Sequence, residues 1–82
     1  MKILYFSWVR ESVGISCEDY KTDAKTVNDL VQELMKKEDR YRIAFKRLDL
    51  IRVAVDKKLV DDFEADLAGV SEIAFFPPMT GG

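Results

Sequence analysis

Apolar and polar positions alternate over several short segments of this chain, which is the pattern of half-buried strands. The segment from Ile51 to Asp56 places Ile51, Val53 and Val55 on one face and polar or small residues on the other. Aromatic and branched residues dominate 2–9, and Ile73 and Phe75 share a face within 72–76. We therefore expect strands over 2–9, 51–56 and 72–76.

One segment has the period of a helix instead. Five apolar residues beginning at Val27 fall on a single helical face, namely Val27, Leu30, Val31, Leu34 and Met35. Thr26 is placed to cap the first turn, with Asp29 three residues further on in a capping-box position. We expect this helix to cover one face of a sheet.

The remaining segments give weaker patterns. We expect a turn or single helical turn over 10–14, and an antiparallel second strand over 15–20. The charge-rich stretch 38–48 fits either a short second helix or an ordered loop, and its sequence does not decide between them. A turn over 56–58, a short edge strand at Leu59-Val60 and a connection over 61–68 complete the predicted order.

The alternation also predicts which strand residues face away from the helix. If Lys2 points outward, Leu4 and Phe6 point outward with it, because side chains two apart share a face. The outward set then contains Leu4, Phe6, Ala54, Leu59 and Phe76. Such a cluster is typical of a protein contact surface, although a helix or loop of the same chain could also cover it.

Composition narrows the class of protein. Eighty-two residues with 48% hydrophobic and 34% charged side chains fit one small globular domain, which we place at residues 1–76. The net charge of −2 argues against a nucleic-acid partner. The apolar stretch after Lys2 is too short for a signal peptide or a membrane span, and Cys17 has no cysteine to pair with. We therefore expect a cytoplasmic protein without a membrane partner.

The final segment, 77–82, differs from the rest of the chain. Pro77 and Pro78 lack an N–H and have fixed φ, so they end the last strand and begin a stiff extended tail. The tail continues through Met79 and Thr80 to the glycine pair 81–82, which offers little steric obstruction. This composition predicts a carboxylate that is activated chemically, for example as an adenylate. The alternative is an inert, frayed terminus.

Three segments together resemble a known family. The ending Glu72-Ile73-Ala74-Phe75-Phe76-Pro77-Pro78-Met79-Thr80-Gly81-Gly82, the opening 2–14 and the strand 52–56 are similar to the small subunit of molybdopterin synthase, the MoaD family of ubiquitin-like sulfur carriers related to ThiS. The resemblance implies an α+β, ubiquitin-like β-grasp fold: a mixed sheet of four to five strands on one main helix, with a flexible Gly-Gly tail. The chain departs from the family at Asp56, where an Asn is usual, and at the turn 68–72.

The resemblance also implies a chemistry. An ATP- and magnesium-dependent adenylyltransferase, a MoeB-like activating enzyme, would adenylate Gly82, and a sulfur donor would convert it to a thiocarboxylate (1-thioglycine). The tail residues Pro78, Met79, Thr80 and Gly81 would then thread into the large subunit, within a heterotetramer of two small and two large subunits. There Gly82 would give sulfur to cyclic pyranopterin monophosphate in molybdenum cofactor biosynthesis.

The same resemblance implies that this chain is not catalytic alone. The active site of the synthase, a sulfurtransferase, would lie on the large subunit, and no metal or permanently bound cofactor is expected on this one. Phe6, Leu59 and Phe76 would be its contacts with the large subunit, in agreement with the predicted outward face. Three alternatives remain open: a sulfur carrier for thiamine synthesis or tRNA thiolation, a ubiquitin-like protein modifier, and a binding module with an inert tail.

Overall fold

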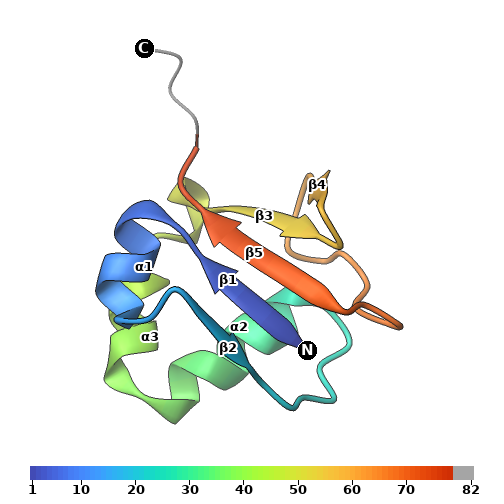
Figure 1. The fold of residues 1–82 in the computed structure, drawn as a ribbon, viewed down its shortest axis with the longest axis horizontal. Helices are drawn as coiled ribbons and strands as arrows, with labels where there is room; N and C mark the ends of the chain where they lie inside the picture. The colour runs from blue at the N-terminus through green and yellow to red at the C-terminus, as the bar shows by residue number, and fades with distance from the viewer. Residues whose placement is uncertain (79–82) are drawn as a thin grey trace.

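The computed structural model describes residues 1–78 and shows a five-stranded sheet with all of its helices on one face (Figure 1). The strand order is β2-β1-β5-β3-β4. The elements in chain order are β1 (Lys2–Tyr5), α1 (Ser7–Val13), β2 (Cys17–Asp19), α2 (Val27–Lys37), α3 (Asp39–Ala44), η1 (Leu48–Leu50), β3 (Arg52–Val55), β4 (Lys58–Val60) and β5 (Glu72–Phe76). The predicted α+β architecture, a mixed sheet on one main helix, is confirmed.

The central strand of the sheet, β5, lies beside β1, which comes from the opposite end of the chain. β1 and β5 pair in parallel, with Tyr5 opposite Phe75. The three other pairings, β1 with β2, β3 with β5 and β3 with β4, are antiparallel. Because β5 is central, the segment that follows it leaves from the middle of one edge of the sheet (Figure 1).

The core lies between the sheet and the helices. Phe75 packs between two aromatic rings, with its centroid 6.1 Å from that of Tyr5 and 4.9 Å from that of Phe45. Ile3, Tyr5, Val53, Ile73 and Phe75 are the buried side chains of the strands. These are the inward positions that alternation predicts.

The helix predicted to start at Thr26 is confirmed as α2. The Thr26 hydroxyl accepts a hydrogen bond from the Asp29 N–H at 3.2 Å, which satisfies one of the free donors of the first turn. The buried residues Val27, Leu30, Val31 and Leu34 form its inner face. The apolar stripe is therefore core.

The prediction of a strand over 2–9 is wrong beyond Tyr5. Ser7 has a positive φ of 56°, which breaks the strand, and α1 begins there. Val9 and Val13, four residues apart, are buried on one face of α1, so the helical period prevails over the strand propensity of the aromatic residues. For 10–14, where a turn or a single helical turn was expected, the helical alternative is confirmed. These residues form the end of α1, which runs to Val13, and Gly14 closes the helix with φ 93°.

Most of the other predicted elements are confirmed with shorter bounds. The stretch 38–48, for which two readings were open, contains the helix α3, in which Tyr41 and Ala44 are buried. The second strand and the edge strand exist as β2 and β4. In the turn before β4, the Asp56 carboxylate accepts hydrogen bonds from the N–H groups of Ser71 and Glu72, both at 3.0 Å. Asp56 thus ties this turn to the start of β5.

A polar network fixes β2 to the helical layer. The Glu18 carboxylate accepts hydrogen bonds from the hydroxyls of Tyr5, at 2.7 Å, and Tyr41, at 2.6 Å. The Lys37 ammonium lies 3.8 Å from the same carboxylate. Burial, together with the hydrogen bond to the negative Glu18, raises the pKa of Tyr41 to about 12 and raises the pKa of Tyr5 further still.

These tyrosines predict a loss of stability in alkali. In the unfolded chain they titrate near pH 10, so between about pH 10 and pH 12 the folded chain binds more protons than the unfolded chain. Their stabilising contribution is complete below pH 10 and is lost as pH rises, by about 1.4 kcal/mol per pH unit for each group. Urea unfolding from pH 8.5 to 11.5 should show this fall, with a shallower slope for Tyr41→Phe. Parallel curves for the two proteins would contradict the assignment.

Candidate functional site

The face of the sheet opposite the helices is open and carries a row of small and apolar side chains. Residues paired across neighbouring strands point to the same face, and the register places in one row Cys17, Leu4, Ala74, Ala54 and Leu59. The Leu59 side chain is 67% exposed and that of Phe6 49% exposed. Within residues 1–78, the alternative that a helix or loop of the same chain covers this face is therefore wrong.

Polarity changes along this open face. At the end where β1 and β5 begin, Lys2 pairs with Glu72 and Asp19, which makes a charged border. At the other end, where β5 finishes, Phe6 and Phe76 are the aromatic side chains of the face, with Arg52 opposite Phe76 on β3. An apolar centre with a charged border is the usual composition of a protein–protein interface.

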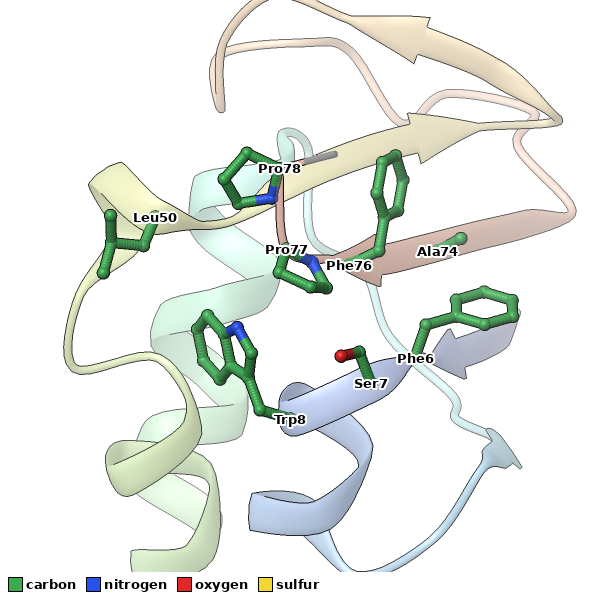
Figure 2. A pocket seen from close by; sticks show the side chains of 8 residues that line it. All are labelled: Phe6, Ser7, Trp8, Leu50, Ala74, Phe76, Pro77 and Pro78. Carbon is green, nitrogen blue, oxygen red and sulfur yellow. The ribbon is translucent and has the colours of Figure 1, made fainter. Parts of the chain in front are cut away.

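At the aromatic end the surface forms a hollow of about 800 Å³ (Figure 2). It is lined by residues from the ends of β1 and β5, the start of α1, and η1: Phe6, Ser7, Trp8, Leu50, Ala74, Phe76, Pro77 and Pro78. None of these side chains is charged. The small Ala74 lies on β5 near the rings of Phe6 and Phe76, while Trp8, Leu50 and Pro78 lie on the other side of Pro77 in this view.

Two of the three predicted partner-binding residues line the hollow, and the third does not. Phe6 and Phe76, from opposite ends of the sequence, come together around the hollow, and the predicted tail residue Pro78 lines it with them. Leu59 lies on the same open face but at the β4 edge, apart from the hollow. Sequence reasoning missed Trp8 and Leu50, because the first was assigned to a strand and the second lies in a segment without a clear period.

The structure agrees with the predicted end of the sheet. β5 ends at Phe76, and Pro77 and Pro78 lead away from the sheet (Figure 1). The predicted tail residues Met79, Thr80 and Gly81, and the predicted reactive residue Gly82, lie outside the described residues. Their roles stay predictions.

Other kinds of site find little support among residues 1–78. They include no group of three or more His, Cys, Asp or Glu side chains positioned to hold a metal ion. No helix in this part of the chain is long and apolar enough to cross a membrane. Cys17 is exposed at the β2 edge rather than packed as a small apolar residue.

The fold and this surface define a class: a β-grasp domain with an uncovered apolar sheet face that leads into a carboxy-terminal extension. The family model described as the ThiS family matches residues 3–82, and the chain belongs to that family. It is 39% identical over 82 residues to the molybdopterin synthase sulfur carrier subunit of Escherichia coli K12, covering 100% of this chain and 99% of the relative.

Solved structures give the same fold. SAMP1 from Haloferax volcanii, also described as small archaeal modifier protein 1, has a TM-score of 0.68 at 26% identity, covering 100% of this chain and 98% of the other. A complex of subunits 1 and 2 of the molybdopterin-converting factor from Helicobacter pylori 26695 contains a chain with a TM-score of 0.62 at 20% identity. The alignment with it covers 99% of this chain and 96% of that one. The predicted ubiquitin-like β-grasp fold and the resemblance to this family are confirmed.

Phenylalanines on opposite faces of the sheet predict changes in stability of different size. Phe75→Ala should lower the free energy of unfolding by about 3–5 kcal/mol, because it leaves a cavity between Tyr5 and Phe45. Phe6→Ala should change it by less than about 1 kcal/mol, because half of that side chain is already in water. Urea unfolding of both variants tests the assignment of faces. A similar large loss for both would show that Phe6 belongs to the core.

Proposed function

We propose that this chain is the sulfur-carrying small subunit of a molybdopterin synthase. The observation that carries the proposal is the relationship to the E. coli sulfur carrier subunit over the whole chain, within a family match that extends to Gly82. The charge-free hollow beside Pro77 and Pro78 supports it, since a carrier needs an apolar docking surface next to its reactive segment. The site of action would be the cytoplasm.

The proposed chemistry takes place at Gly82. Its carboxylate attacks the α-phosphate of ATP on an activating enzyme that supplies magnesium, giving an acyl adenylate and pyrophosphate. A sulfur donor then displaces AMP and leaves a thiocarboxylate. This anion is a better nucleophile than the carboxylate, because sulfur is soft and polarizable, and its sulfur bonds to cyclic pyranopterin monophosphate inside the large subunit. Water then cleaves the bond between the sulfur and the Gly82 carbonyl carbon, so that the sulfur stays on the pterin and Gly82 returns to a carboxylate.

In this proposal the chain positions the reactive carboxylate, and catalytic groups are supplied by its partners. Pro77 and Pro78 prevent β5 from continuing as a hydrogen-bonded strand, so the residues after it are free to enter a partner. Six residues from Pro77 onward reach at most roughly 20 Å. The open face, with Phe6, Leu59 and Phe76, would bind the large subunit in a heterotetramer of two small and two large chains, while Pro78, Met79, Thr80 and Gly81 thread toward its active site.

The mass of the protein tests the carrier function directly. Incubation with an ATP-dependent activating enzyme and a sulfur donor should add about 16 Da at Gly82, the difference between sulfur and oxygen. Deletion of Gly82 should abolish both this gain and molybdopterin formation with the large subunit. Unchanged product formation by the deletion variant would favour an inert tail.

A second function is favoured by the likeness to small archaeal modifier protein 1. A protein modifier would form an isopeptide bond between Gly82 and lysines of other proteins. Mass spectrometry of tryptic peptides from the host distinguishes the two. Lys58 is the last tryptic site in the sequence, so conjugation leaves the segment 59–82 attached through Gly82 to target lysines. Abundant conjugates without any thiocarboxylate would replace the carrier proposal. Activity with a thiamine or tRNA thiolation enzyme would instead change only the acceptor of the sulfur.

The open face gives a separate prediction. Phe76→Asp should weaken binding to the large subunit by at least about tenfold, because a charge would be buried at the centre of the contact. Its cooperative unfolding should persist, since Phe76 points away from the core. Binding is measured by calorimetry and folding by urea titration. Unchanged affinity in the folded variant would exclude Phe76 from the contact.

A further inference from the structure

The hollow extends beyond the strand residues discussed above, onto α1 and η1. Trp8 and Leu50 form its far wall, and neither is a strand residue (Figure 2). The Leu50 side chain is 41% exposed. The opposite wall is formed by Pro77 and Pro78, at the root of the tail. A group that fills the hollow therefore touches the folded body and the tail at the same time.

The lining is apolar apart from two groups. The Ser7 hydroxyl and the Trp8 indole N–H are its polar side-chain atoms. In Figure 2 the hydroxyl points toward Trp8, and the indole nitrogen is on the side of the ring that faces Pro77. Apolar walls with a few convergent hydrogen-bonding groups are the usual composition of a specific binding pocket. The hollow suits an apolar side chain whose adjacent backbone carbonyl can accept a hydrogen bond.

Chain length limits what can occupy it. Residues 79–82 lead from Pro78 to the proposed reactive residue Gly82, and they can span at most about 14 Å. If Gly82 reacts inside a partner, as the proposed function requires, the mouth of that partner's active site must come within this distance of Pro78. The surface around that mouth then lies against the hollow, because Pro78 itself lines it.

We infer that the hollow between Trp8, Leu50 and Pro77-Pro78 receives an apolar side chain from the large synthase subunit and so fixes the direction in which the tail enters that subunit. This inference rests on the proposed function. It assigns a positioning role to Trp8 and Leu50, which act on the tail through the seated side chain and do not touch the reacting atoms. It predicts that these residues affect sulfur transfer as well as affinity.

Leu50→Lys tests the inference, with Ile43→Lys as the matched control. Both replace an exposed aliphatic side chain, and Ile43, which is 66% exposed on α3, does not line the hollow. Leu50→Lys should bind the large subunit at least about tenfold more weakly, while Ile43→Lys binds as the wild type does. Ala74→Leu should also weaken binding, because it places a larger side chain in the lining of the hollow without removing any core side chain.

Two readouts separate a positioning role from simple affinity. Trp8 is the only tryptophan, so its indole N–H gives a single cross-peak in a ¹⁵N-labelled sample, and that peak should shift on addition of the unlabelled large subunit. In single-turnover transfer from the thiocarboxylated chain, Leu50→Lys should remain slower than the wild type even at saturating large subunit. A rate restored fully by saturation would overturn the positioning role.

The outcomes distinguish this inference from the proposed function. If the wild-type chain transfers sulfur while Leu50→Lys and Ala74→Leu bind normally and the indole peak does not move, the inference is wrong and the function stands. If the wild-type thiocarboxylate neither binds the large subunit nor transfers sulfur to it, the function fails and the inference with it. If Leu50→Lys instead dissociates a dimer of the chain alone, the occupant is a second copy and the inference is wrong.

Discussion

The opposite orientation of Phe75 and Phe76 is the constraint on which the rest of the structure depends. One ring is held between Tyr5 and Phe45 in the core, and the next lies on the open face beside the tail. β5 is hydrogen-bonded to both β1 and β3. The orientation of Phe75 and Phe76 therefore determines, through the register, which side chains of β1 and β3 point into the core and which point outward. A slip of one residue would bury the outward set and expose the core.

Most of the body could be predicted because its signals are local. The capped apolar stripe from Thr26 specifies α2, and alternation around Phe75 specifies β5 together with the face on which Phe6, Leu59 and Phe76 lie. The buried valines of α1 are also periodic, but the aromatic residues before them favour a strand equally well. What separates strand from helix there is the backbone conformation of Ser7, which the sequence does not reveal.

The hollow could not be predicted for a different reason. Trp8, Leu50 and Pro78 come from three distant segments, and no spacing along the chain connects them. They meet because β5 pairs in parallel with β1 and antiparallel with β3. The start of α1, the end of η1 and the exit of β5 therefore fall at the same end of the sheet. The open face is thus a property of strand alternation, whereas the hollow is a property of topology.

Ser7 lies where the open face meets the hollow. A non-glycine residue at φ 56° is in the left-handed region, which costs of order 1 kcal/mol and persists where the surroundings impose it. Phe6, before it, still follows the outward alternation of β1, while Trp8, after it, belongs to the first turn of α1. Without this abrupt turn the residue after Phe6 would continue the strand, and Trp8 would lie in the sheet rather than at the wall of the hollow. The strained residue therefore lies where the apolar face and the root of the tail meet.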